Sequence, residues 1–189
     1  MFIRKRTIKR TIVVLLLLLL IVTISKHNFI EKMLYPYPYK QTVEKYAMEY
    51  GVDPYLVISV IREESRFRTQ SVSSKGATGL MQLMPDTAKE IAVWLEENYE
   101  DVDLTKPDDN IRYGTWYLAT RSKEFSGNII ITLASYNAGI GRVKSWLKES
   151  PKDFNSYLIE DIPYKETREY VQKVLKSYGK SSKLYGKET

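Results

Sequence analysis

Apolar residues recur three and four positions apart along most of the chain after residue 40, and no segment alternates apolar and polar positions as a half-buried strand does. This spacing predicts an all-α fold, and no internal repeat divides it. The predicted helices cover residues 42–50, 54–67, 85–98, 111–123, 129–136, 142–147 and 164–178. The polar segment 71–78 is predicted to be a loop.

Glycine, proline and short polar side chains mark several of the predicted helix ends. Asp53-Pro54 supplies a capping carboxylate and a preset first turn, and Gly51 ends the helix before it. Residues 108–110 are expected to cap the helix that begins at residue 111. Pro163 begins the last predicted helix, and residues 179–189 are expected to form a frayed C-terminal tail.

The most apolar segment, TIVVLLLLLLIVTI at residues 11–24, follows a basic segment at residues 4–10. Charge inside a bilayer is costly, and basic residues before an apolar run favour a cytoplasmic N-terminus. We therefore expect a basic cytoplasmic tail at residues 1–10 and a single-pass transmembrane signal-anchor helix at 11–25. The remaining chain would lie on the extracytoplasmic side of the cell membrane. The run is shorter than the roughly 20 residues of an ordinary span, so a cleaved signal peptide is the alternative.

A tyrosine- and proline-rich segment follows the apolar run. In YPYPY at residues 35–39, alternate prolines lack a backbone donor and favour an extended chain. Residues 26–40 are therefore predicted to form a stalk before a folded domain at residues 41–178. Alternatively, the tyrosines of this segment pack against the domain or lie at the membrane interface.

Composition excludes several kinds of chemistry. The chain has no cysteine and only one histidine, His27, so thiolate metal sites, disulfides and a Ser/His/Asp triad in the folded domain are excluded. The formal net charge is +6, but six of the 29 basic residues lie in the first 30 positions, where no acidic residue occurs. Because the rest of the chain is formally neutral, the charge gives no reason to expect binding to nucleic acid.

One carboxylate stands in an apolar position. Val57, Val60 and Ile61 form an apolar stripe on the predicted helix 54–67, and Glu64 continues this stripe three residues after Ile61. A carboxylate on the core-facing side of a helix is costly unless it is paired or protonated. Burial raises the pKa of such a group, as a general acid that works near neutral pH requires.

Two structural explanations for Glu64 compete with a catalytic one. Glu64 could form an exposed ion pair with Arg68 four residues on, or a buried ion pair with an arginine from elsewhere. The neighbouring Glu63 lies about a hundred degrees around the helix and is expected to be solvated.

Four motifs occur in order along the domain. They are Glu64-Ser65, GAxGLMQLMP at residues 76–85, YNAG at residues 136–139 and ExIPYxETRxYV at residues 160–171. Together they resemble the SLT catalytic domain of lytic transglycosylases, glycoside hydrolase family 23, over about residues 41–178. The chain departs from that pattern at Glu63, where many members have Gln, and at Ser135, where Ala is usual.

The resemblance implies a lysozyme-like α fold with a cleft for the glycan strands of peptidoglycan. Glu64 matches the catalytic glutamate of the family. The residues that match cleft positions are Ser65, Gln82, Met84, Tyr136, Asn137 and Glu160. Each also has an ordinary structural explanation: Met84 and Tyr136 could belong to the core, Gln82 and Asn137 could bond helix ends, and Glu160 could pair with Arg168.

The activity implied by the resemblance is cleavage of the β-1,4 bond between N-acetylmuramic acid and N-acetylglucosamine, with formation of a 1,6-anhydro ring. This chemistry needs one carboxylate and no metal or organic cofactor. The alternatives are a muramidase that hydrolyses the same bond and a catalytically idle glycan-binding module. Peptidoglycan and, through the N-terminal helix, the membrane are the expected partners; the sequence identifies no partner in the envelope machinery.

Overall fold

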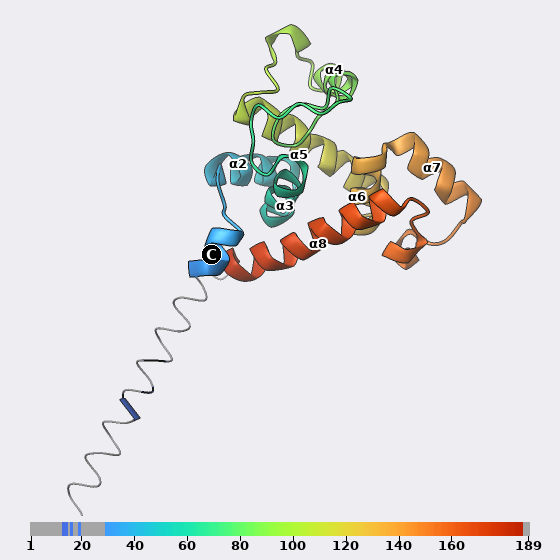
Figure 1. Ribbon diagram of the computed structural model, residues 1–189. Helices are drawn as coiled ribbons and strands as arrows, with labels where there is room; N and C mark the ends of the chain where they lie inside the picture. Colours follow the sequence, from blue (N-terminus) through green and yellow to red (C-terminus); the bar gives the residue numbers. More distant parts are fainter. Residues whose placement is uncertain (1–12, 15, 17–18, 20–28, 187–189) are drawn as a thin grey trace, which may run out of the picture.

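The computed structural model describes residues 13–14, 16, 19 and 29–186, and this part of the chain is helical, as predicted (Figure 1). Its helices are α2 Lys40–Tyr50, α3 Pro54–Ser65, α4 Pro85–Trp94, α5 Pro107–Glu124, α6 Ile129–Ala138, α7 Ile140–Glu149 and α8 Lys165–Tyr185. Three short 3-10 helices lie between them: η1 Tyr99–Asp101, η2 Phe154–Ser156 and η3 Ile159–Asp161. Within the described residues, extended pairing is limited to isolated bridges from Thr78 to Val72 and Leu83.

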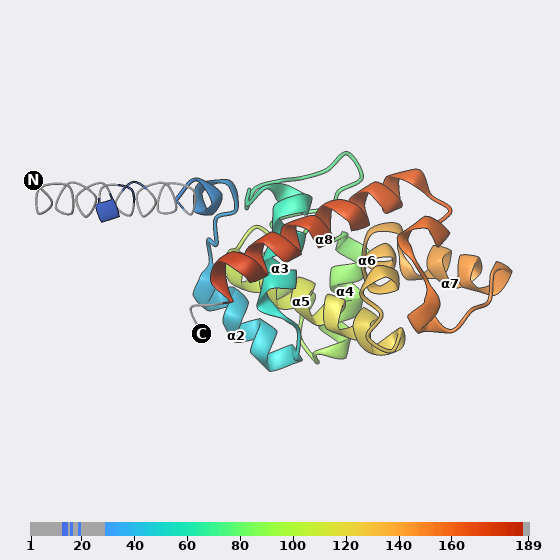
Figure 2. The same cartoon turned by 90° about the horizontal axis from the view of Figure 1, so that it is seen from below.

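Helix α3 lies at the centre of the domain, where α2 and the long α8 pack against it (Figures 1 and 2). Every residue from 56 to 61 is buried, which explains why this helix is apolar on nearly all sides. Its start follows the predicted signals, because the Asp53 side chain accepts a hydrogen bond of 2.8 Å from the Tyr55 N–H and Pro54 occupies the first turn.

A second, smaller apolar cluster forms beside the main core. It joins α4 and the loop before it to the first half of α5, and its buried members are Leu83, Ala88, Ile91, Ala92, Leu104 and Tyr113. The main core is built from α2, α3, α6, α7 and α8 together with parts of α5. The chain between α3 and α4 therefore belongs partly to a separate small lobe. A cleft can form at the junction between this lobe and the main core.

Several helix boundaries differ from the predictions. Helix α3 ends at Ser65 and not near 67, because Arg66 and Phe67 take left-handed backbone conformations with φ of 52° and 65°. Helix α5 begins at Pro107, so Asn110 lies inside the helix and does not cap it. Helix α4 stops at Trp94, several residues before the predicted end.

The predicted frayed tail is wrong for the described residues, because α8 continues as a helix through Tyr185. Val174, Ser177 and Ser181 are buried at helical spacing and continue the packed face of α8 beyond Gly179. The contact surface that stabilises these last turns comes from the segment predicted to be a stalk.

Residues 29–39 pack against the domain. Residues 29–34 are helical, and Glu31 forms an ion pair of 2.5 Å with Lys180. The Tyr185 hydroxyl donates a hydrogen bond of 2.8 Å to the Tyr35 carbonyl, and the Tyr37 ring lies 5.3 Å from the Tyr185 ring, centroid to centroid. The prediction of an extended stalk is wrong here, and the alternative, tyrosines packed against the domain, is confirmed.

The predicted membrane anchor at residues 11–25 lies almost entirely outside the described residues. Among the helices that the structure does describe, none has both the length and the hydropathy that crossing a bilayer requires.

Candidate active site

Glu64 occupies the last turn of α3, where the apolar stripe ends. Val57, Val60 and Ile61 are completely buried, as their spacing predicted, and Glu64 continues their face of the helix and is itself mostly buried. The left-handed Arg66 ends the helix two residues later. The carboxyl therefore lies at the point where a buried helix leaves the core.

Burial raises the pKa of Glu64 from 4.5 to about 7. Desolvation is the main cause; the nearby Tyr170 hydroxyl lowers the pKa, and the negative charge of Glu63 raises it. Glu64 has no ion pair among the described residues. The proposed pair with Arg68 does not form, since the Arg68 Nε donates a 3.0 Å hydrogen bond to the Ser65 carbonyl. A protonated carboxyl near neutral pH is the outcome expected for a general acid.

Two tyrosine side chains lie close to Glu64 in the interior. The Tyr136 hydroxyl donates a hydrogen bond of 2.8 Å to the Met81 carbonyl. The Tyr170 hydroxyl is buried and makes no hydrogen bond of regular geometry within the described structure, although it is near enough to affect the pKa of Glu64. Burial and the charge of Glu64 raise the pKa of both tyrosines well above 10, so both keep their protons.

Glu63 is not solvated as predicted. Its side chain is only 16% exposed, and its Oε1 accepts hydrogen bonds of 2.5 Å from the Arg62 guanidinium and 2.6 Å from the Ser177 hydroxyl on α8. These contacts fix Glu63 as a charged neighbour of Glu64.

Four of the predicted cleft residues line one cavity of about 300 Å³ at the junction of the two apolar clusters. Gln82 and Met84 come from the small lobe, and Tyr136 and Asn137 come from the end of α6. Met84 is 40% exposed and is therefore not a core residue. A neighbouring cavity of similar volume contains Asn137, Tyr170 and Glu63. Asn137 is exposed and lines both cavities.

The structure does not bring the other two predicted residues into these cavities. Ser65 is fully buried, and its hydroxyl donates a hydrogen bond of 3.2 Å to the Ile61 carbonyl. Glu160 is exposed on η3 and lines neither cavity. It has no ion pair with Arg168, whose guanidinium donates to the Ile162 carbonyl.

The Gln82 side chain supports the loop that carries it. Gln82 has φ of 48°, and its Nε2 donates hydrogen bonds of 3.1 Å to the Ser71 carbonyl and 2.9 Å to the Gly79 carbonyl. Gln82 was predicted, as the structural alternative, to hydrogen-bond a helix end. It does form such hydrogen bonds, but to the carbonyls of a loop. Gln82 therefore lines the cavity and also holds the loop in position.

Two residues of α5 that were not predicted to belong to the site also hold this loop in position. The buried Asn110 accepts a hydrogen bond of 2.7 Å from the Met81 N–H and donates to the carbonyls of Thr78 and Leu104, each at 2.9 Å. A side chain at Gly114 would collide with the Met81 side chain. Because Tyr136 bonds the Met81 carbonyl, these contacts link α5, the loop and α6. The only sequence signals for this support were an asparagine just before one predicted helix and a glycine inside it.

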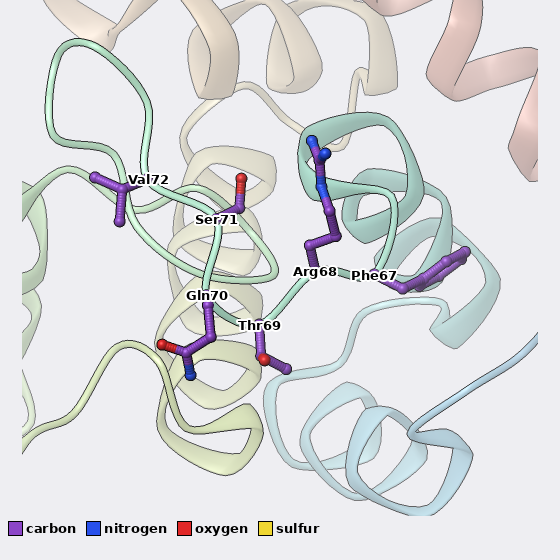
Figure 3. Close-up of a pocket in the computed structure, with 6 residues that line it drawn as sticks. All are labelled: Phe67, Arg68, Thr69, Gln70, Ser71 and Val72. Carbon is purple, nitrogen blue, oxygen red and sulfur yellow. The ribbon is translucent and has the colours of Figure 1, made fainter.

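A hollow of about 590 Å³ lies along residues 67–72 after α3 (Figure 3). All of its lining comes from this one segment, and the side chain of Arg68 points away from those of Thr69 and Gln70 (Figure 3). Groups that do not converge cannot orient a ligand, so we place the candidate site at the two cavities that share Asn137. Glu64 itself lines neither cavity; it lies behind them, near Tyr170 and Tyr136, each of which lines one of them.

The all-helical architecture, with a mostly buried carboxyl near the junction of two lobes, matches the lysozyme-like fold. The chain belongs to the transglycosylase SLT domain family, whose model matches residues 41–159.

The chain is similar to curated and solved lytic transglycosylases. It is 35% identical over 144 residues to the soluble lytic murein transglycosylase of Salmonella typhimurium, covering 75% of this chain and 22% of that protein. It is 31% identical over 160 residues to the membrane-bound lytic murein transglycosylase C of Edwardsiella ictaluri, covering 72% of this chain and 44% of that one. The chain thus spans about a fifth to less than half of the length of these relatives.

Among solved structures, the chain resembles an inactive mutant of lytic transglycosylase Slt from Pseudomonas aeruginosa, with a TM-score of 0.72 and 39% identity. That likeness covers 82% of this chain and 25% of the other. The 70-kDa soluble lytic transglycosylase in complex with bulgecin A gives a TM-score of 0.73 at 30% identity, covering 82% of this chain and 26% of the other.

Proposed function

We propose that this protein is a peptidoglycan lytic transglycosylase in which Glu64 is the single catalytic acid and base. The observation that carries the proposal is the position of the Glu64 carboxyl, which is mostly buried at the end of the apolar stripe of α3 and has no ion pair among the described residues, on a residue that matches the catalytic glutamate of the family. Burial there raises the pKa of Glu64 to about 7. The lytic murein transglycosylase names of the relatives support the choice of substrate and reaction.

In the first step, protonated Glu64 donates its proton to the oxygen between N-acetylmuramic acid and N-acetylglucosamine, and the bond from the muramic anomeric carbon to that oxygen breaks. The carbonyl of the muramic 2-acetamido group stabilises the positive charge at the anomeric carbon. Ionised Glu64 then accepts the proton of the muramic 6-hydroxyl, whose oxygen bonds the anomeric carbon. The 1,6-anhydro ring closes without water, and Glu64 is protonated again.

The side chains around the two cavities have separate roles in this proposal. Asn137 is exposed between the cavities and can bond the N-acetyl and hydroxyl groups of the sugars. Gln82 and Tyr136 shape the wall, and Met84 supplies an apolar surface next to them. Ser65 acts indirectly, because its hydroxyl bonds the Ile61 carbonyl and so supports the end of α3 that carries Glu64. The role of Glu160 at the cleft stays a prediction from the resemblance.

We also propose that the domain works at the outer face of the cell membrane, with residues 1–10 in the cytoplasm and residues 11–25 as a single-pass anchor. The basic residues before the apolar run support this orientation. In this arrangement, the packed segment 29–39 holds the catalytic domain, residues 41–178, close to the bilayer. Added protease should degrade the domain in intact wall-stripped cells while it spares cytoplasmic proteins; full protection of the domain would refute the topology.

Product analysis tests the proposed reaction. Purified full-length protein is incubated with peptidoglycan, and the released muropeptides are separated and identified by mass. The proposal predicts muropeptides that end in 1,6-anhydro-N-acetylmuramic acid and lack a reducing end. Reducing ends would establish the muramidase alternative, and no turnover of any peptidoglycan by the folded protein would favour the glycan-binding module.

A further inference from the structure

A separate pocket of about 160 Å³ lies between α4 and α5, next to the proposed active site. Three of its eight lining residues are aromatic, namely Trp94, Trp116 and Tyr117, and Trp94 is 75% exposed. Most large aromatic side chains bury their faces, so an exposed tryptophan beside a pocket marks a surface that can contact a ligand.

The pocket adjoins the cavity that holds Gln82, Tyr136 and Asn137. Thr87 and Tyr117 line both. The Tyr117 ring also packs edge-to-face against the Tyr136 ring, 5.4 Å away, and the pKa of Tyr136 responds to the charge of Glu64. A glycan strand that fills that cavity would therefore lie next to the pocket, with Tyr117 between the two.

Arg121 supplies a hydrogen-bond donor in this pocket. Its guanidinium stacks over the Tyr117 ring at 4.9 Å and pairs with Glu124 at 3.3 Å. Its Nε is buried and has no hydrogen-bond partner within the described structure. A buried donor without a partner is costly, so a shift of the Arg121 side chain that brings Nε to a ligand acceptor would remove an existing penalty.

These features favour a neutral sugar over a charged group. Arg121 pairs with Glu124, which also pairs with Lys144 at 2.5 Å, and Glu90 lines the pocket, so positive and negative charges around the pocket offset one another. The unpartnered group is the Arg121 Nε–H, which a hydroxyl or an N-acetyl carbonyl satisfies. A sugar ring has one face of C–H groups that can lie against the Trp94 indole. The volume is below the roughly 300–1,000 Å³ of a pocket for a drug-sized ligand, which suits one ring.

From this geometry we propose that the pocket of Trp94, Trp116, Tyr117 and Arg121 is an additional subsite for one sugar ring of the same glycan strand, beyond the residues around Glu64. The inference rests on the proposed function, because it assumes that glycan occupies the neighbouring cavity. The subsite gives the enzyme a preference for strands that are long enough to fill both places.

Binding to an inactive protein tests the subsite apart from catalysis. Full-length protein with Glu64→Gln is titrated with peptide-free glycan strands of graded length. Adding Trp94→Ala should weaken binding of long strands at least about fivefold, the factor that corresponds to a contact of about 1 kcal/mol, and should affect a short fragment less. Trp94→Phe should restore part of the loss. Val93→Ala is the matched control, because Val93 is 76% exposed on the same helix and does not line the pocket.

Three results separate the possibilities. Equal binding of long strands with and without Trp94 would overturn the subsite. A loss seen only with peptide-bearing strands would also overturn it, because the occupant would then be a stem peptide. Wild-type protein is assayed for turnover in parallel: Trp94-dependent binding of peptide-free strands without turnover would support the subsite and refute the proposed reaction.

Discussion

Replacing Glu64 with Gln should change the stability of the protein in a way that depends on pH. The amide keeps the size and shape of the side chain but cannot ionise. In the wild type, a carboxyl with an ordinary pKa of 4.5 is held in a site where burial raises its pKa to about 7. Folding therefore favours the protonated form of Glu64, and the ionised form opposes folding.

The size and sign of the effect follow from these two values. Below pH 4.5 the carboxyl is protonated in the folded and the unfolded states, so wild type and variant should differ little. As the pH rises from 4.5 to 7, the unfolded state loses its proton first and the wild type loses stability. Above pH 7 the loss is complete, at about 3 kcal/mol. Glu64→Gln should thus be more stable than wild type by up to that amount at pH 8.

Urea unfolding of the full-length protein in mild detergent, at pH values from 4 to 8, measures this difference. Glu149→Gln is the matched control, because Glu149 is exposed on α7 and should show no comparable trend. A difference between Glu64→Gln and wild type that stays constant with pH, or that shrinks as pH rises, would refute the claim that burial controls this carboxyl.

Two further predictions concern the supports of the site. We expect activity to fall near pH 7, where Glu64 loses its proton. Tyr170→Phe removes the hydroxyl that lowers the pKa of Glu64, so this fall should move to higher pH in a pH–rate profile. A move to lower pH would contradict the assignment. Asn110→Ala leaves the Met81 N–H and two carbonyls without their partner, and should lower the free energy of unfolding by about 2–4 kcal/mol in urea titrations; a loss below about 1 kcal/mol would mean that water replaces the amide.

The sequence predicted the parts of the fold that depend on local signals. Helical spacing placed Val57, Val60 and Ile61 in the core, and Asp53-Pro54 located the start of α3. The same spacing predicted the burial and the raised pKa of Glu64, because a carboxyl that continues an apolar stripe must share its environment.

Features that depend on contacts between distant segments could not be predicted in this way. The last turns of α8 are polar enough to suggest fraying, and only the packing of residues 29–39 against Tyr185 explains why they stay helical. Glu63 was expected in solvent because its partner Ser177 lies 114 residues further along the chain. The hydrogen bonds from Asn110 to Met81 and from Tyr136 to Met81 join three segments. The sequence of each segment contains no signal of its contact with the other two.

The most direct test of the central claim is the turnover of purified peptidoglycan by wild type, Glu64→Gln and Glu63→Gln, measured as 1,6-anhydro-ended muropeptides released per enzyme. With one carboxyl as both acid and base, Glu64→Gln should lose nearly all turnover, more than the typical 10²–10⁴-fold of general acid–base catalysis, while it remains folded. Glu63→Gln should lose far less. Retention of a tenth or more of wild-type turnover by Glu64→Gln would contradict the assignment of Glu64 as the catalytic residue.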